Sequence, residues 1–549
     1  MIEIKCVNTN SIVLINEGEN LFEVLKSCGI KNEDKKILGA YVNNKVQNMY
    51  YKVYTSKRVE FITMDNPNGR RMYALSLMFL LYKAVRECFP NGELRILHSL
   101  SEGYYAEINN IDIDKDNVIP SLKLKMTEIV KSDIPFERTI IEADKAAALF
   151  EKAGIDEKTE LIRGRGRLFT KMDYLDGMLN TFFFELVPST SYLKAFDLRL
   201  FHKGFILVMP SQNKVRTKAN SKLFSVFQEH KHWIEILNTP YVSDLNRLID
   251  TGKQKEIIMV SEALHEKKYA EIADDIFIRR NDVKIVLLAG PSSSGKTTSC
   301  KRLATQLAVL GFSPLQISLD DYFVNREFTP KDSDGNMDFE ALNALDLEYF
   351  NFQMQSLLKG EKIELPKFNF FTGEREQSGK LLSMKSNSIL IVEGIHALNP
   401  VLSQKIARKN KYHIFVSALT QVAIDRHNLI NTSDNRLLRR ILRDNQFRGY
   451  NAEATISRWQ SVREGEEKHI FPYQENADSI FNSSLLYEIN VMKKVIEPLL
   501  AEVPEVSSAY AEARRLRNFL SLFKSIDNAD IVPQNSVMRE FLGGSSFDY

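Results

Sequence analysis

The chain has 549 residues, of which 44% are hydrophobic and 26% charged, a composition typical of a soluble protein with several domains. Its 73 basic and 71 acidic residues give a formal net charge of +2, which excludes a global basic field for nucleic acid but leaves a local patch open. The four cysteines lack CxxC spacing, which argues against a disulfide framework or a zinc ribbon. With no signal-peptide pattern and no run of 18 apolar residues, the sequence predicts a cytoplasmic protein without a membrane span.

Residues 1–64 alternate short β-like runs with one helix. The runs at 2–7 and 11–15 predict a hairpin, and residues 20–30 predict a helix that ends near Gly29. Two further strand-like runs follow before a turn-rich boundary. This order and length predict a small domain of β-grasp size.

Residues 65–210 mix helical and strand-like patterns. The apolar stretch 72–89 predicts a buried helix, and the runs at 104–109 and 204–210 predict strands. An α+β domain is therefore expected. Residues 211–280 are polar with helical periodicity, so they are expected to form a helical connector.

From residue 281 the apolar runs lose their alternation, which is typical of strands buried on both faces of a parallel sheet. Helical stretches separate these runs and give successive βα units over residues 281–500. Residues 501–549 are expected to form a C-terminal tail, whose last part, residues 532–549, is too polar and too rich in Gly and Ser for structure to be predicted. The fold class expected is multidomain α/β, with a P-loop NTPase parallel sheet and flanking helices after the two smaller domains. The buried strands are expected at 284–290, 314–321, 388–394 and 412–418.

A phosphate-binding loop lies between the first of these strands and an amphipathic helix. Gly290, Gly295, Lys296 and Thr297 fit the pattern G-x-x-x-x-G-K-[ST]. Backbone N–H groups in such a loop hold phosphates, the lysine reaches the β- and γ-phosphates, and the hydroxyl binds Mg²⁺. The alternative is a Gly/Ser turn before a structural helix. The residues expected to bind ATP are Gly290, Pro291, Ser292, Ser293, Ser294, Gly295, Lys296, Thr297, Thr298 and, from a later segment, Arg448.

Two acidic positions follow predicted strands. Asp320 ends one buried run and Glu393 ends another, and ligands of open α/β sheets bind at the carboxyl ends of strands. Asp320 is placed to accept a proton from an attacking hydroxyl or to hold Mg²⁺, and Lys296 completes the catalytic set. Helix N-capping is the alternative for Asp320 and its neighbour Asp321. The expected metal-binding residues are Thr297, Asp320 and Glu393.

A basic helical segment follows the sheet. Such a face is often only solvated, but a phosphoryl-transfer enzyme needs cations that close over the transferred group. We therefore expect a lid in which Arg439, Arg440 and Arg443 act in catalysis. The arginines of the segment are Arg436, Arg439, Arg440, Arg443 and Arg448.

Six ordered segments, "GPSSSGKTT", "SLDDYF", "DFEALNALD", "LPKFNFFTGER", "IVEGIHAL" and "RRILRD…RG", resemble the uridine kinase and phosphoribulokinase group of P-loop kinases over residues 284–487. The resemblance implies phosphorylation of a nucleoside 5′-hydroxyl, uridine or cytidine, with Asp320 as the base. It also implies an acceptor pocket. The residues expected to line that pocket are Phe339, Glu340, Phe368, Phe370 and Arg375.

The acceptor region departs from the family pattern. The family has aspartate where this chain has Glu340, tyrosine at Phe368, a base-reading histidine at Gly373 and a glutamine at Arg458. Each change alters a polar group that would read uracil. A different small alcohol, such as a sugar phosphate, therefore stays open as the acceptor, and the phenylalanines could equally be core.

The front half resembles threonyl-tRNA synthetases: residues 1–64 are similar to the TGS domain and residues 65–210 to the editing-type domain. Where the editing site has HxxxH, this chain has Leu75 and Phe79, and Leu193 and Asp197 replace Cys-x-x-x-His. We expect a binding or regulatory module without editing chemistry, whose ligand could be a nucleotide, an amino acid, RNA or a second copy of the chain. An ATP-gated RNA-binding protein with vestigial kinase chemistry is the third hypothesis.

Overall fold

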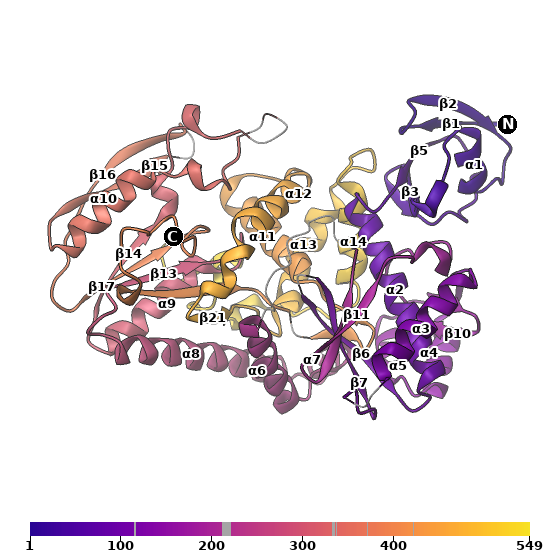
Figure 1. The fold of residues 1–549 in the computed structure, drawn as a ribbon, viewed down its shortest axis with the longest axis horizontal. Helices are drawn as coiled ribbons and strands as arrows, with labels where there is room; N and C mark the ends of the chain where they lie inside the picture. Colours follow the sequence, from indigo (N-terminus) through magenta and orange to yellow (C-terminus); the bar gives the residue numbers. More distant parts are fainter. Residues whose placement is uncertain are drawn as a thin grey trace.

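The computed structural model describes residues 1–100, 102–114, 117–210, 221–331, 335, 337–369, 372–420 and 422–548. The chain forms an elongated molecule, with the N-terminal domain at one end and a parallel sheet at the other (Figure 1). The expected multidomain α/β class is confirmed. In the described ranges, every helix is too short or too polar to cross a membrane.

The N-terminal region is a five-stranded sheet with one helix. Its strands are β1 (Ile2–Cys6), β2 (Ser11–Ile15), β3 (Gly39–Val42), β4 (Lys45–Gln47) and β5 (Lys57–Ile62). They lie in the order β2-β1-β5-β3-β4, with β1 antiparallel to β2 and parallel to β5. The helix α1 (Leu21–Ser27) begins at a capping box between Asn20 and Glu23, so the local sequence sets its start. The hairpin and the helix that the sequence predicts are both present.

The next region packs helices against two antiparallel sheets. The long helix α2 (Pro67–Cys88) begins at Asn66 with proline at its first position and buries most of its apolar residues, as predicted. A four-stranded sheet has the order β11-β12-β7-β6, and a three-stranded sheet the order β10-β9-β8. The remaining elements are β6 (Glu93–Leu100), β7 (Gly103–Asn109), α3 (Val118–Lys131), β8 (Glu137–Glu142), α4 (Ala143–Lys152), α5 (Asp156–Gly164), β9 (Phe169–Leu175), β10 (Met178–Asn180), β11 (Asp197–Phe201) and β12 (Gly204–Val208).

Three helices, α6 (Ser221–Leu237), α7 (Val242–Asp250) and α8 (Gln254–Ile278), follow. They do more than connect two domains. Tyr269, Ile272 and Ile276 of α8 are buried in one core with the parallel sheet, so α8 covers part of one face of that sheet. Figure 1 shows α8 running along the lower edge of this half of the molecule.

The parallel sheet positions the site. Its strands are β13 (Ile285–Ala289), β14 (Ser313–Ser318), β17 (Ser388–Glu393), β18 (Lys411–Ser417) and β21 (Ser479–Asn482), in the order β14-β17-β13-β18-β21. All four predicted apolar runs are strands of this sheet, and all strand pairs are parallel. Their carboxyl ends therefore share one edge, where ligands bind in such folds. The helices α9 (Lys296–Val309) and α10 (Leu347–Leu358) and the hairpin β15 (Ile363–Asn369)–β16 (Glu374–Leu382) complete this part.

The C-terminal part is helical. Its helices are α11 (Thr432–Arg448), α12 (Ala452–His469), α13 (Glu488–Ala501), α14 (Tyr510–Leu520) and α15 (Arg539–Leu542). The sequence did not predict structure after residue 501, and this was wrong: Leu516, Phe523 and Phe541 are buried in a core shared with α11, α12 and α13. The apolar residues of this stretch are spread among polar ones, so only their long-range partners reveal the packing.

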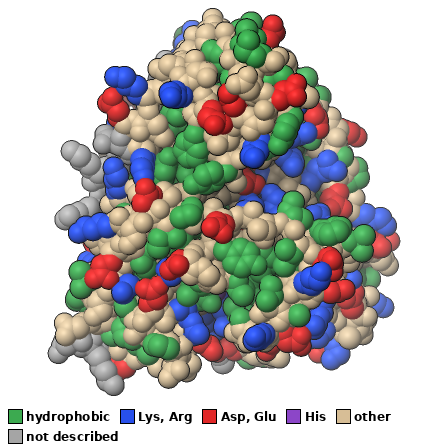
Figure 2. Space-filling model, turned by 90° about the vertical axis from the view of Figure 1, so that its right-hand side faces the viewer, with side chains coloured by type: hydrophobic (Ala, Val, Ile, Leu, Met, Phe, Trp, Pro, Cys, Tyr) green, Lys and Arg blue, Asp and Glu red, His purple; other side chains and the backbone are tan. Residues whose placement is uncertain are grey.

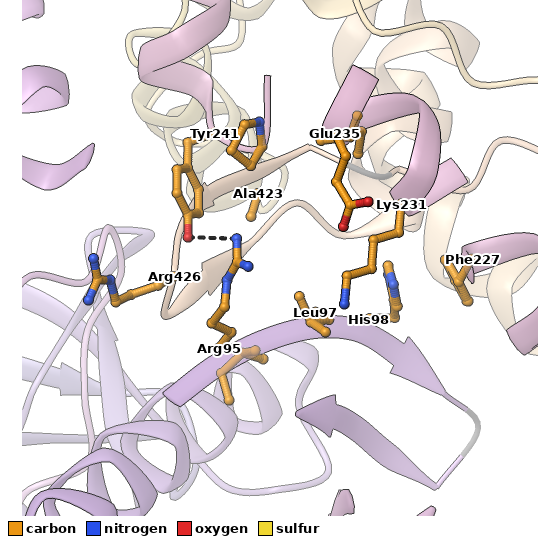
Figure 3. Close-up of a pocket in the computed structure, with 12 residues that line it drawn as sticks. Arg95, Leu97, His98, Phe227, Lys231, Glu235, Tyr241, Ala423 and Arg426 are labelled. Atoms are coloured by element: carbon orange, nitrogen blue, oxygen red, sulfur yellow. Dashed lines mark hydrogen bonds between the residues drawn. The ribbon is translucent and has the colours of Figure 1, made fainter. Parts of the chain in front are cut away.

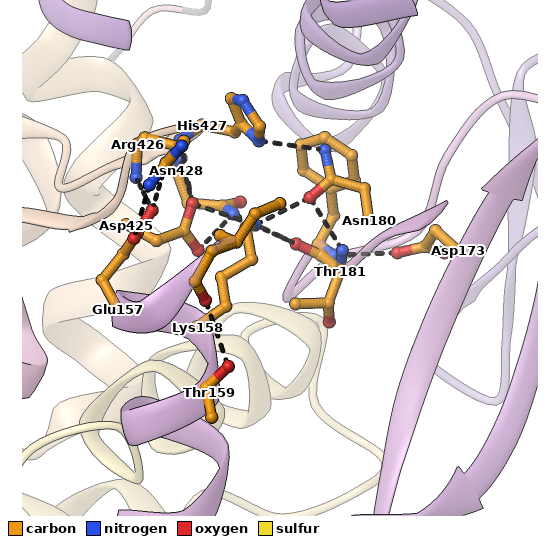
Figure 4. A network of polar contacts seen from close by, with 12 residues as sticks. Glu157, Lys158, Thr159, Asp173, Asn180, Thr181, Asp425, Arg426, His427 and Asn428 are labelled. Atoms are coloured by element: carbon orange, nitrogen blue, oxygen red, sulfur yellow. Dashed lines mark hydrogen bonds and ion pairs between the residues drawn. The ribbon is translucent and has the colours of Figure 1, made fainter. Parts of the chain in front are cut away.

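A short hairpin, β19 (Ala423–Asp425)–β20 (Asn428–Leu429), joins the two halves of the molecule (Figure 4). Lys158 Nζ lies 3.0 Å from Asp425 Oδ1, and both side chains are fully buried. Beside them, Arg426 Nε donates to Glu157 at 2.6 Å. Breaking a buried ion pair leaves an uncompensated charge, so this network fixes how the halves meet.

Candidate phosphate-transfer site

The phosphate loop leaves the central strand β13 at Gly290. A Cβ atom at this position would lie 2.1 Å from the carbonyl oxygen of Val416, so only glycine fits the close backbone approach. Gly295 then takes a φ of 81° and directly precedes α9, which begins at Lys296. The two glycines therefore let the chain turn from the end of a buried strand straight into a helix N-terminus.

Backbone N–H groups of the loop donate to carboxylates from distant segments. Ser292 N lies 3.1 Å from Glu466 Oε1, and Thr298 N lies 3.2 Å from Glu540 Oε2. Lys296 Nζ donates to the carbonyl oxygen of Pro291 at 3.2 Å. Phosphate binding requires N–H groups at a helix N-terminus that donate to anionic oxygens, so the loop fits a nucleoside triphosphate.

Oxygen ligands gather beside the loop. Glu393 ends β17 next to Ser318, which ends β14, and the two residues are register partners. Glu393 Oε1 accepts from Thr297 Oγ1 at 3.4 Å and from Ser318 Oγ at 3.2 Å. Burial and the neighbouring Asp320 charge raise the pKa of Glu393 to about 7, against the pull of Lys296.

Asp320 follows β14 in a 3₁₀ turn (Leu319–Tyr322) and is solvent-exposed. A hydroxyl and two carboxylates suit Mg²⁺, which keeps several waters and takes few protein ligands. Thr297, Glu393 and Asp320 are the residues that would hold it. In the described part of the chain no three His, Cys, Asp or Glu side chains form a metal cage.

Three arginines crowd around one carboxylate at the end of α11. Arg440, Arg443 and Arg448 lie 3.3 Å, 2.9 Å and 3.8 Å from the oxygens of the buried Asp444. Arg440 also donates from Nη1 to Ser292 Oγ at 2.8 Å. Three guanidinium groups against one carboxylate leave an excess of positive charge beside the loop, where it can stabilise phosphate oxygens.

The other two arginines of α11 are held inside the protein. Arg436 is ion-paired with Glu466, and Arg439 donates from Nε to Glu488 Oε2 at 2.7 Å. Both guanidinium groups are almost completely buried. Arg439, expected in the lid, therefore occupies a core ion pair, because Glu488 on α13 faces its side of the helix.

The acceptor region contains aromatic rings and one acid. Phe323 packs against Phe339 and Phe368, with ring centroids 6.1 Å and 5.5 Å apart. Phe339 is 37% exposed whereas Phe368 is only 4% exposed, so Phe368 belongs largely to the core. Oε2 of Glu340 is buried with no hydrogen-bond partner among the described residues. Burial and the charge of Glu466 raise the pKa of Glu340 to about 7.

The remaining acceptor candidates are engaged elsewhere or lie outside the description. Arg375 donates to Asp346 Oδ2 at 2.8 Å and lies over the ring of Tyr349. Phe370 lies outside the described residues. At Gly373, a Cβ atom would lie 2.6 Å from Arg326 Nε, so an arginine side chain occupies the space beside this glycine.

Sequence reasoning missed four residues of this site. Ser318 donates to Glu393, and Glu466 accepts from Ser292 N. Asp444 pairs with three arginines, and Glu540 accepts from Thr298. Only Asp444 carried a sequence signal, since it lies four residues after Arg440 on one helix face. The other three contacts join positions 75, 174 and 242 residues apart, which no local pattern encodes.

Two of the four positions at which the front half departs from the editing pattern, Phe79 and Leu193, are packed as core. Phe79 is fully buried with Phe136 and Phe182 at ring distances of 5.9 Å and 5.4 Å, and Leu193 is fully buried too. Asp197 pairs with Lys123 at 2.6 Å. These side chains pack and pair, and the apolar ones supply no group that could ligate a metal or move a proton.

A separate hollow lies between β6, α6 and β19 (Figure 3), with an empty volume of about 600 Å³ that opens to solvent. Arg95 donates to Tyr241 Oη at 3.0 Å, and His98 stacks on Phe227 at 3.8 Å. Burial and the nearby Lys231 lower the pKa of His98 to about 3, so its ring is neutral.

Over the face shown in Figure 2, basic and acidic side chains are interspersed with apolar ones.

Comparison with known proteins gives different relatives for two parts of the chain. Residues 285–489 match the Phosphoribulokinase / Uridine kinase family. The N-terminal region matches threonine–tRNA ligases: the enzyme of Fusobacterium nucleatum is 28% identical over 249 residues, which are 44% of this chain and 38% of the relative. That of Carboxydothermus hydrogenoformans is 29% identical over 203 residues, 36% and 31% of the two chains. This chain thus spans less than half the length of these relatives.

Among solved structures, a "possible uridine kinase" from Bacillus stearothermophilus aligns at 17% identity over 39% of this chain and all of that chain, with a TM-score of 0.26. D-glycerate 3-kinase from Cryptococcus neoformans aligns at 14% identity over 49% of this chain and 87% of that chain, with a TM-score of 0.21. By the family match, residues 285–489 are a domain of the Phosphoribulokinase / Uridine kinase family, in a chain whose N-terminal region is similar to threonine–tRNA ligases.

Proposed function

We propose that the chain is an ATP- and Mg²⁺-dependent kinase that phosphorylates the 5′-hydroxyl of a nucleoside. The observation that carries this proposal is the position of Asp320 and Glu393 at the ends of neighbouring strands, beside Lys296 and Thr297 of the loop. A base, a metal carboxylate and a phosphate-binding lysine are the parts that phosphoryl transfer needs.

In this proposal each side chain has one task. Asp320 accepts the proton of the attacking hydroxyl, and its exposure leaves it accessible to an acceptor. Lys296 and Arg440 stabilise negative charge on the transferred group, with Arg443 and Arg448 adding to the field. Thr297, Glu393 and Asp320 hold Mg²⁺, which when bound neutralises charge on the phosphate oxygens.

The acceptor region supports a molecule with a flat ring and hydroxyl groups. The exposed edge of Phe339 offers a stacking surface. The unpaired Oε2 of Glu340 is able to accept a hydrogen bond from a sugar hydroxyl. The charges of Lys296 and Asp320 both act on the Glu340 carboxyl, so this carboxyl lies close to the proposed reaction centre.

The test is an acceptor panel. Purified full-length protein is incubated with γ-labelled ATP, Mg²⁺ and each of several nucleosides, sugars and sugar phosphates. We expect label transfer to a pyrimidine nucleoside above all others. Transfer to no nucleoside, together with turnover of another alcohol, would contradict the nucleoside assignment and retain the kinase.

A sugar phosphate is the second candidate, and one observation favours it. Arg326 packs against Gly373, where the uridine kinases have the histidine that reads the base. A guanidinium group at this place suits a phosphate better than a uracil edge. Variant Arg326→Ala separates the two candidates, because it should raise KM strongly for an anionic acceptor and little for a nucleoside.

We further propose that residues 1–64 and 65–210 form a TGS-like and an editing-like binding module without editing activity. The apolar packing of Phe79 and Leu193 supports the loss of chemistry. RNA, an amino acid or a nucleotide are the ligands to test. The mixed charges on the face in Figure 2 give no preference for RNA, so a tRNA gel shift with the full-length chain is the direct measurement.

A further inference from the structure

The end of the chain lies on the phosphate loop. Residues 536–542 include Val537, Met538 and Phe541, which are fully buried. A Cβ atom at Gly295 would lie 2.3 Å from Val537 Cγ2, so this segment touches the loop at its last glycine. The segment itself lies outside residues 285–489, which match the kinase family.

Glu540 of this segment reaches the first turn of α9. Its Oε2 atom accepts from Thr298 N at 3.2 Å and from Thr298 Oγ1 at 2.6 Å. Thr298 is the third residue of the helix. N–H groups in the first turn after a phosphate loop are the donors that hold phosphate oxygens, so a carboxylate oxygen here stands where a phosphate oxygen would bind.

Two carboxylates accept hydrogen bonds from backbone N–H groups at the phosphate loop, and their surroundings differ. Glu466, on Ser292, is neutralised by Arg436 and by Arg463, whose Nη1 lies 3.1 Å away. Glu540 has no ion pair with a lysine or arginine in the part of the chain that is described. Its uncompensated charge also contributes to the raised pKa of Glu393. Glu466 is thus built into the loop, whereas Glu540 resembles a bound anion.

We propose that residues 536–542 are an autoinhibitory segment, in which Glu540 occupies a phosphate position at Thr298 and has to leave before a triphosphate binds. This inference rests on the proposed function, because it concerns the nucleotide site of that kinase. Two anions cannot share the same pair of donors, and their repulsion at contact distance is strong in a partly buried site. Nucleotide affinity is then reduced by the fraction of molecules in which the segment is closed.

The segment is attached to the elements that have to respond. Phe541 lies 5.1 Å from the guanidinium of Arg439, and Gln446 Nε2 donates to the carbonyl oxygen of Leu542 at 3.3 Å. Both partners are on α11, which also carries Arg440. Opening the segment therefore removes contacts from the arginine-bearing helix as well as from the loop.

The preceding helix α14 contacts the front half of the chain. Arg71 lies 3.4 Å from Glu512, and Lys45 lies 2.9 Å from Glu505 just before α14. The N-terminal module is therefore connected by direct contacts to the element that leads into the autoinhibitory segment. Figure 1 shows the C-terminal part passing from α14 in the middle of the molecule to the parallel sheet.

The test compares Mg·ATP binding to full-length wild type and Glu540→Gln by titration calorimetry. Glutamine keeps the size and the accepting oxygen but removes the charge. We expect a Kd at least about 10-fold lower for Glu540→Gln than for wild type. Asp530→Asn, at an exposed acid that precedes the segment, is the control and should not change the Kd. An unchanged or higher Kd in Glu540→Gln would overturn the inference.

Hydrogen–deuterium exchange of the wild-type chain gives an independent readout that needs no variant. Residues 536–542 should exchange faster when Mg·ATP is present, and equal or slower exchange would contradict displacement of the segment. The proposed function fails separately: if Glu540→Gln binds Mg·ATP more tightly but no nucleoside is phosphorylated, only the acceptor assignment falls. If a nucleoside is phosphorylated but the Kd is unchanged, only the autoinhibition falls.

Discussion

The phosphate loop and the α2 region differ in what occupies the positions where chemistry is expected. At the strand ends of the parallel sheet, Lys296, Asp320 and Glu393 are polar and grouped. On α2, Leu75 and Phe79 replace the histidines of the editing pattern, and Phe79 is core. The comparison teaches that similar sequence does not by itself preserve a reactive site: the α2 positions are apolar and Phe79 is packed as core, whereas the strand-end positions carry ionisable groups.

The largest expected effect is the loss of activity in Lys296→Ala. In the proposed function this change removes the cation that stabilises the transferred phosphate, so kcat/KM should fall by roughly 10³-fold or more, a loss of about 4 kcal/mol of transition-state stabilisation. Steady-state kinetics with the best acceptor measure it. Lys267→Ala, an exposed lysine on α8, is the matched control and should retain activity. Retained activity in Lys296→Ala would contradict the proposal that the phosphate loop is a kinase site.

The next largest effect, on stability, is expected at the buried ion pair between Lys158 and Asp425, where the two halves of the molecule meet. Lys158→Ala leaves the fully buried Asp425 without its partner, which costs about 3–5 kcal/mol of unfolding free energy. Urea denaturation measures the loss. Lys158→Met with Asp425→Leu should recover much of it, since a buried pair can be replaced by apolar groups. If Lys158→Ala is as stable as wild type, the stability of the molecule does not depend on this contact between its halves.

Glu340 gives a pH-dependent prediction for the kinase half. Its pKa is raised to about 7 in the folded state, above the value of about 4.3 in an unfolded chain. Folding therefore favours the protonated form, and stability falls as the pH rises from about 4.5 to 7. Glu340→Gln should be about 1–3 kcal/mol more stable than wild type at pH 8 and equal to it near pH 4.5.

Denaturant unfolding at the two pH values checks this sign. Glu348→Gln, on α10, serves as the control for removing an acidic charge. An equal effect of Glu340→Gln at both pH values would mean that Glu340 ionises normally in the folded chain. That outcome would remove one argument for a carboxyl group with an unpaired oxygen in the acceptor region.

The smallest effect is expected at the surface contact between the front half and the C-terminal part. Lys45 and Glu505 are partly exposed, and such pairs contribute at most about 1 kcal/mol. Glu505→Ala should therefore change the melting temperature by only a few degrees, less at high salt. A large loss would indicate that this contact, rather than the buried ion pair, holds the two regions together.

Much of the fold could be predicted from the sequence because its signals are local. The capping box at Asn20, the apolar helix over 72–89 and the four buried strands are all encoded within short windows. The loop residues from Gly290 to Thr298 were found for the same reason. Local signals fail where structure depends on distant partners.

Three features depended on such partners. The ordered C-terminal part needs α11–α13 to bury Leu516 and Phe541. Arg439 could not be distinguished from Arg440 by spacing, because only the position of Glu488 decides which of them is buried. The helix α8 covers part of the parallel sheet, although its sequence was expected only to form a connector. Its buried apolar residues face a strand surface that the sequence alone does not place beside it.

The most direct test of the central claim, that the parallel-sheet domain is an active kinase with Asp320 as its base, is single-turnover phosphate transfer by Asp320→Asn. The matched control is Asp321→Asn, the same change one residue later at a carboxylate that accepts from Phe368 N. We predict a loss of about 10²–10⁴-fold in the transfer rate for Asp320→Asn and a loss below about 10-fold for Asp321→Asn. Equal rates for Asp320→Asn and wild type would contradict the account.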